Sequence, residues 1–96
     1  MADTKGEIQF IVHAKDPEMA LGTDTINEHL SRAALNEFPV ELTCLDGSTL
    51  SGTPRMGLVE NENGYNIVMG IKDGAYKVPL PSGVHKLVAF LPNKKA

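Results

Sequence analysis

The sequence predicts a mainly β fold of the α+β type, in which a short helix precedes a strongly bent, five-stranded antiparallel small barrel. Apolar and polar residues alternate with the two-residue period of strands from position 39 onward. Short turns separate these stretches, at 46–47, 61–64, 72–74 and 81–83. One segment with helical periodicity comes before them, and an extra strand comes before that segment. Short strands joined by short turns favour a small barrel over an open sandwich, which would need more strands.

Residues 6–15 are predicted to form the extra N-terminal strand. Ile8, Phe10 and Val12 alternate onto one face of it, and Ile11 falls on the opposite face. A strand outside the main run adds most simply to an exposed sheet edge, in its own subunit or in a neighbour's.

A helix is predicted over residues 25–37. Thr25 precedes Glu28 by three residues, the spacing of a capping box that would begin the helix. Its apolar side chains fall on one narrow face: Ile26, Leu30, Ala33 and Ala34. An isolated helix of about three turns is marginal in water, so we expect this one to pack on the sheet. Pro39 disfavours helical geometry at the residue before it and so ends the helix.

The small barrel is predicted over residues 39–92. Its first strand alternates, with Val40, Leu42 and Cys44 on one face, and the Asp46-Gly47 pair then turns the chain. Gly52 and Pro54 predict a sharp corner in the second strand, which continues extended through residue 60. One face of the third strand is apolar: Tyr65, Ile67, Met69 and Ile71. The last strand is expected to place four alternating residues on one side: Val84, Lys86, Val88 and Phe90. Residues 93–96 read as a basic tail, and residues 1–96 as a single domain.

Composition narrows the class of protein. The formal net charge is -3, which argues against a general polyanion binder. No apolar run is long enough to span a bilayer, so no membrane association is expected. The N-terminal residues lack the apolar core of a secretion signal, and a single cysteine, Cys44, cannot form an intramolecular disulfide. We therefore expect a cytoplasmic protein.

No catalytic, metal or cofactor site is predicted. His13, His29 and His85 lie on three different predicted elements and share no metal-ligand spacing. Cys44 alternates with apolar residues, as a small buried hydrophobe does, and has no basic neighbour to activate it. The glycines are spread at turn spacing and form no phosphate-cradling cluster before a helix.

These elements resemble the Sm-like family, including its bacterial Hfq branch, in which a short N-terminal helix leads into a five-stranded bent barrel. The stretch PVELTCLDGSTLSG supplies the family's apolar, Asp-Gly and Leu-x-Gly positions in order: Val40, Leu42, Leu45, Asp46, Gly47, Leu50 and Gly52. Asn66 opens the third strand as the family's asparagine does, and Tyr76-Lys77 is similar to an Hfq run. Ser82 stands where the family often has an arginine, before Gly83.

The resemblance implies a non-enzymatic binding protein: a ring-forming, RNA-binding or RNA-chaperone module that forms a homo-oligomer by edge-strand pairing. Aromatic rings beside amide and ammonium donors suit single-stranded RNA, because they stack on bases and hydrogen-bond to them. The candidate RNA-binding residues lie on the predicted third to fifth strands: Tyr65, Asn66, Tyr76, Lys77, His85 and Lys86.

Two alternatives stay open. The negative net charge favours a protein-interaction or inhibitory module, such as a phage or accessory protein, that binds a protein partner and no nucleic acid. A PilZ-like receptor for cyclic dinucleotides is also a small barrel. Its paired arginines are absent, however, since Arg32 stands alone.

Overall fold

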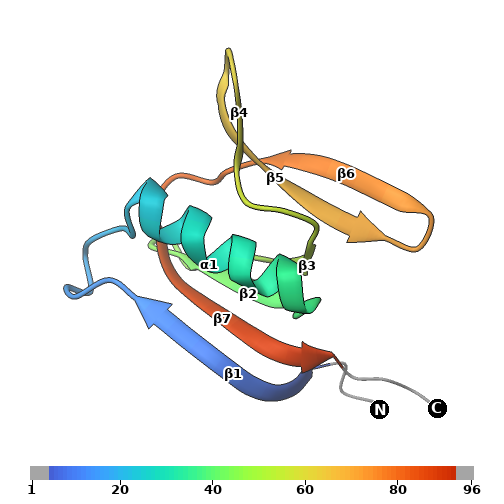
Figure 1. Ribbon diagram of the computed structural model, residues 1–96. Helices are drawn as coiled ribbons and strands as arrows, with labels where there is room; N and C mark the ends of the chain where they lie inside the picture. The colour runs from blue at the N-terminus through green and yellow to red at the C-terminus, as the bar shows by residue number, and fades with distance from the viewer. Residues whose placement is uncertain (1–4, 93–96) are drawn as a thin grey trace.

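The computed structural model describes residues 5–92, which form one helix and seven strands (Figure 1). Along the chain, helix α1 (Thr23–Asn36) follows the first strand and precedes the second. The strands are β1 (Lys5–His13), β2 (Val40–Cys44), β3 (Thr49–Pro54), β4 (Val59–Asn61), β5 (Gly64–Ile71), β6 (Gly74–Pro79) and β7 (Val84–Pro92). The mainly β class with one helix is confirmed. The predicted tail at 93–96 lies outside the described residues.

All the strands belong to one antiparallel sheet, in the order β1-β7-β2-β3-β5-β4, with β6 paired to the other edge of β5. Helix α1 lies across one face of this sheet (Figure 1). No ladder among the described residues joins β1 at one end to β6 at the other. The sheet is therefore open, and the closed barrel stays a prediction.

The predicted N-terminal strand adds to β7 of its own chain. Because β7 also pairs with β2, both of its edges are occupied. Ile8 lies opposite Phe90, whereas Phe10 lies opposite Ala89, so one extra residue bulges out of β1 between them. Because of the extra residue, the side chains of Ile8 and Phe10 lie on opposite faces of β1. The predicted grouping of Ile8 with Phe10 was therefore wrong. Ile8 instead shares the face of Ile11, and both are about half exposed, at 53% and 50%.

Helix α1 begins two residues earlier than predicted, and the capping box was wrong. Gly22 is the N-cap residue and makes no side-chain cap hydrogen bond. Thr25 lies inside the helix, where its carbonyl oxygen is 2.8 Å from Nδ1 of His29. The predicted apolar face does meet the sheet, since Ile26, Leu30 and Ala33 are buried in the core.

Strand β2 and the turn after it form as predicted. Val40, Leu42 and Cys44 are buried, and the amide of Gly47 donates to the carbonyl of Cys44. Strand β3 then pairs with β2 through residues 49–52 and with β5 through residues 53–54, so the predicted corner lies at Gly52. A Cβ at position 52 would meet the sulfur of Met69 at 2.9 Å, which explains why the corner needs a glycine.

The predicted second strand is interrupted. Residues 55–58 leave the extended path, and β4 resumes the pairing along the same edge of β5. Helix α1 holds this segment, because the amide of Leu58 donates to Oδ1 of Asn27 at 2.8 Å. A long-range contact of this kind leaves no local pattern in the sequence.

The core lies between α1 and the sheet. Its buried members are Ile26, Leu30, Ala33, Val40, Leu42, Cys44, Ile67, Met69, Val84, Leu87 and Ala89. Thr43 pairs with Lys86, but the next residue, Cys44, pairs with Val84, so β7 has an irregularity at His85. The predicted grouping of Val84 with Lys86 was therefore wrong, because Val84 turns into the core.

Candidate nucleic-acid interface

The β5–β6 hairpin carries four of the six predicted RNA-binding residues, on two faces. Tyr65 lies opposite Leu80, and Tyr76 lies opposite Met69, so the two rings are about four residues, or ~13 Å, apart along the strands. Asn66 and Lys77 lie on the opposite face of the hairpin from the two tyrosines. The structure thus separates the tyrosines from each other and from the two polar donors.

The remaining two predicted residues lie on β7. Nδ1 of His85 is 3.1 Å from the carbonyl oxygen of Met19, a contact that joins β7 to the segment leading into α1. Lys86 pairs with Thr43 on one side and His13 on the other, so it belongs to the β1–β7–β2 part of the sheet. Neither residue is in register with the β5–β6 hairpin.

Tyr65 lines a small pocket of about 260 Å³ beside the first turn of α1. Asp24 and Glu60 line the same pocket. Two carboxylates repel a phosphate, so this end of the hairpin does not suit the backbone of a nucleic acid.

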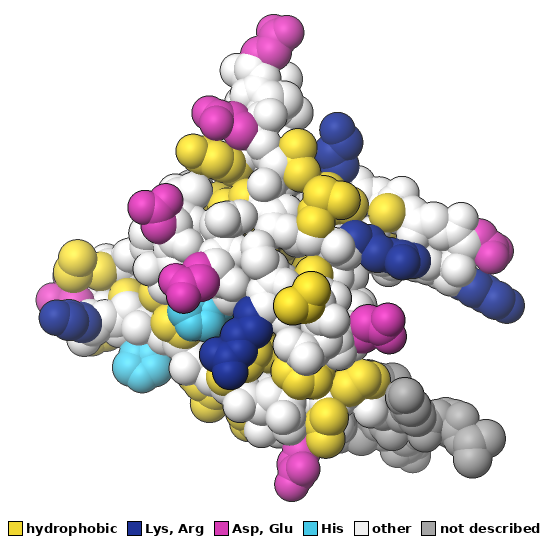
Figure 2. Space-filling model, viewed as in Figure 1, with side chains coloured by type: hydrophobic (Ala, Val, Ile, Leu, Met, Phe, Trp, Pro, Cys, Tyr) yellow, Lys and Arg dark blue, Asp and Glu magenta, His cyan; other side chains and the backbone are white. Residues whose placement is uncertain are grey.

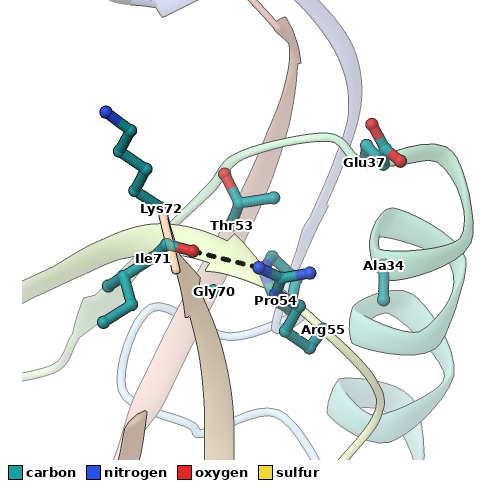
Figure 3. A pocket seen from close by; sticks show the side chains of 8 residues that line it. All are labelled: Ala34, Glu37, Thr53, Pro54, Arg55, Gly70, Ile71 and Lys72. Carbon is teal, nitrogen blue, oxygen red and sulfur yellow. Dashed lines mark hydrogen bonds between the residues drawn. The ribbon is translucent and has the colours of Figure 1, made fainter. Parts of the chain in front are cut away.

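A larger pocket lies where the C-terminal end of α1 faces β3 and the β5–β6 turn (Figure 3). Its volume is about 540 Å³. The side chains that give it its chemistry are Ala34, Glu37, Thr53, Arg55, Ile71 and Lys72. They come from the helix end, from the corner where β3 stops, and from the hairpin turn.

Arg55 is the anchored cation of this pocket. Its Nη2 donates to the carbonyl oxygens of Ile71 at 3.0 Å and Gly74 at 3.1 Å, on both sides of the hairpin turn. The side chain reaches the turn by passing over Gly70, where a Cβ would collide with its Nε. The glycine therefore permits this path, the two hydrogen bonds hold the guanidinium group at the turn, and Nε and Nη1 have no hydrogen-bond partner among the described residues.

Glu37 is the acidic residue of the pocket, and its backbone is strained. It follows the last residue of α1 with φ 60° and ψ 35°, the left-handed conformation that glycine usually takes. Among residues 5–92 it is the non-glycine residue with positive φ. Strain of this kind is often retained where a side chain has a function.

Charge is divided between two ends of the molecule. The acidic end consists of Asp24 and Glu28 on α1 with Glu60 and Glu62 around β4. The basic end consists of Arg55, Lys72 and Lys77, around the β5–β6 hairpin, and it also includes the acidic residue Asp73 in the turn. Figure 2 shows acidic side chains over β4 and the start of α1, and basic ones along the hairpin with acidic ones at its tip and beside it. A chain with negative net charge thus has a cluster of three cations whose charge is partly offset by Asp73 and Glu37.

Arg55, Lys72 and Glu37 were not predicted as site residues. Gly70, inside an otherwise regular strand pattern, was the available signal, because glycine there often marks a close approach by another group. The sequence does not show that the approaching group is the side chain of a residue fifteen positions earlier.

The described residues contain no group of three or more histidine, cysteine, aspartate or glutamate side chains arranged to hold a metal ion. No helix within residues 5–92 has the length and apolar composition needed to cross a membrane. Comparisons with protein-family models, with curated proteins and with solved structures found no match to this chain.

Proposed function

We propose that this chain is a non-enzymatic, Sm-like RNA-binding protein of the RNA-chaperone type, whose copies assemble by pairing their edge strands. The observation that carries the proposal is the β5–β6 hairpin. It combines an unpaired strand edge with the basic end of the molecule.

The strand order supports the Sm-like architecture. Helix α1 precedes β2, and the following strands give the order β7-β2-β3-β5 with β6 beside β5. Strand β3 passes from one half of the sheet to the other at Gly52, which is how a small barrel turns its corner. The proposal includes curling of this sheet into a barrel, with β1 as an addition outside it.

The outer edge of β6 supports assembly. The amide of Leu80 donates to the carbonyl of Tyr65. Because hydrogen-bonded pairs alternate in an antiparallel ladder, the backbone groups of Ala75 and Lys77 point away from β5. Such groups are a ready template for another strand.

Among residues 5–92, the outer edge of β1 is open as well, because β7 is paired on both sides, and so is the outer edge of the three-residue strand β4. We propose that β6 of one copy pairs with β1 of the next. This contact joins two different surfaces of the chain. Repeated contacts of this kind form a ring when the rotation from each copy to the next brings the last copy back to the first.

The assembly is tested by native mass spectrometry of Lys77→Pro beside Lys77→Ala. Proline removes the outward amide of residue 77 and leaves the ladder to β5 intact, whereas alanine removes only the charge. We expect an oligomer for the wild type and for Lys77→Ala, and a monomer for Lys77→Pro. An oligomer that survives Lys77→Pro would refute pairing through β6.

RNA binding is tested by titrating the wild type with uridine-rich and adenine-rich oligonucleotides at several salt concentrations. We expect saturable binding that weakens as salt rises, because the basic end must displace counterions from the phosphates. Absence of binding at low salt would refute the RNA-binding part and leave the assembly untouched.

A protein-interaction or inhibitory module is the second candidate, and the acidic end favours it. Asp24, Glu28, Glu60 and Glu62 lie on the start of α1 and around β4, at the end of the hairpin opposite the β5–β6 turn. An acidic surface of this kind steers association with a basic protein partner. This candidate predicts that charge reversal at Glu60 and Glu62 abolishes capture of the partner, and that oligonucleotides do not compete.

A further inference from the structure

We infer that the pocket between the end of α1 and the β5–β6 turn receives one ribonucleotide of a bound RNA strand. Its phosphate faces Arg55 and Lys72, and its ribose 2′-hydroxyl faces Glu37. The inference rests on the proposed RNA-binding function, and it names a site and a basis for choosing RNA over DNA.

The size of the pocket suits such a ligand. Its volume of about 540 Å³ falls in the range of roughly 300–1,000 Å³ that is typical of small-molecule sites. Ala34 and Ile71 supply apolar surface for the sugar and base, and Thr53 supplies a hydroxyl.

Arg55 is preorganised to bind a phosphate. Two hydrogen bonds to the hairpin turn hold one nitrogen of the guanidinium group, which leaves Nε and Nη1 for a ligand. A cation that is already fixed loses little side-chain entropy when it binds an anion. Lys72, at the turn itself, also lines the pocket, with its side chain extending away from Arg55 (Figure 3).

The pocket is not a site for a simple anion, because the carboxylate of Glu37 would repel a free phosphate. A ribonucleotide resolves this conflict, since it carries hydroxyl donors as well as a phosphate. Carboxylates commonly accept hydrogen bonds from ribose hydroxyls, and the 2′-hydroxyl is the group that distinguishes RNA from DNA.

Gly70→Ala tests the phosphate contact without changing any charge. The added Cβ collides with Nε of Arg55 and must move the guanidinium group. Gly22→Ala is the control, because it lies at the opposite end of α1 from the pocket and its Cβ would meet no atom within 4 Å. Fluorescence anisotropy with an adenine-rich RNA oligonucleotide should show about tenfold weaker binding for Gly70→Ala, from the loss of a charge-assisted hydrogen bond. Gly22→Ala should bind like the wild type.

Glu37→Gln tests the contact with the ribose hydroxyl, and Lys72→Ala tests the attraction of the phosphate. Glu37→Gln should lower the ratio of RNA to DNA affinity for oligonucleotides of the same sequence by about fivefold, the value of one hydrogen bond. Lys72→Ala should weaken RNA and DNA equally and reduce the salt dependence. Since Lys72 is exposed, this variant stays informative even if Gly70→Ala does not fold.

The outcomes separate the two proposals. If the wild type binds RNA but Gly70→Ala binds as tightly as Gly22→Ala and the RNA-to-DNA affinity ratio of Glu37→Gln is unchanged, the pocket is refuted and the proposed function stands. If the wild type binds no RNA, or if only a protein partner binds, the proposed function and this inference both fail.

Discussion

Asn27 and Leu58 join the helix to the break between β3 and β4: Oδ1 of Asn27 accepts a hydrogen bond from the amide of Leu58 at 2.8 Å. Asn27→Ala should lower the free energy of unfolding by about 1 kcal/mol, because the amide loses its partner. Urea denaturation measures this change, and hydrogen exchange at Leu58 should speed up. Asn36→Ala is the control, since Asn36 bonds only within the exposed helix end and should change stability little. Equal losses in both variants would contradict the role given to Asn27.

Replacing Glu37 with glycine should stabilise the fold. The left-handed conformation costs a non-glycine residue about 1–2 kcal/mol, and Glu37→Gly removes that cost. Urea denaturation should show a gain of about 1 kcal/mol, reduced by the greater freedom of glycine in the unfolded chain. Glu37→Ala keeps the strain and should show no such gain. If the pocket binds a ribonucleotide, the more stable glycine variant should also lose its preference for RNA over DNA.

Leu30 fixes the helix to the sheet. It is fully buried in the core, so Leu30→Ala should lower the free energy of unfolding by about 2–5 kcal/mol through lost burial and the cavity that remains. Leu35, in the same helix, is 85% exposed. Leu35→Ala should therefore stay within about 0.5 kcal/mol of the wild type. A small loss for Leu30→Ala would mean that α1 is not packed on the sheet.

Ser48 controls the titration of Asp46 in the β2–β3 turn. The hydroxyl and amide of Ser48 donate to Oδ1 of Asp46 at 2.6 and 2.9 Å, and these bonds hold the pKa of Asp46 below its ordinary value. Ser48→Ala removes the larger cause, so the pKa should rise toward the ordinary value, as measured by NMR titration. Ser48→Thr keeps the hydroxyl and should leave the pKa low.

The sign of the accompanying stability effect follows from the lowered pKa. A carboxyl group whose pKa is lower in the folded state stabilises the fold at pH values above its unfolded pKa. The contribution disappears as the pH falls through the lowered folded value. Ser48→Ala should therefore be less stable than the wild type at neutral pH, and the difference should shrink in acid. A difference that grew in acid would contradict this assignment.

Local patterns predicted much of the fold. The alternation of Val40, Leu42 and Cys44 placed β2 correctly, because this strand itself contains no bulge and its buried residues keep the two-residue period throughout. The apolar face of α1 was equally clear. Both are properties of a few neighbouring residues and need no knowledge of the rest of the chain.

Features set by distant contacts were not predictable in this way. The bulge beside Ile8 and the irregularity at His85 depend on the register between β1, β2 and β7, so simple alternation put Ile8 and Val84 on the wrong faces. The start of α1 was misplaced because its N-cap residue, Gly22, makes no side-chain cap hydrogen bond. The break after β3 depends on the distant contact between Asn27 and Leu58. The pocket was missed for the same reason, since Arg55 reaches the β5–β6 turn only after the sheet has formed.

Strand β7 pairs with β1 on one side and β2 on the other, although β1 precedes every other element along the chain. During translation, β1 leaves the ribosome long before its partner exists, with Ile8 and Ile11 still uncovered by any neighbouring strand. Strands β2 to β6 are able to pair with their sequence neighbours first, since these contacts are local. Insertion of β7 between two waiting strands is then the step that completes the sheet, and until it occurs both edges of β1 are open to pairing with other chains.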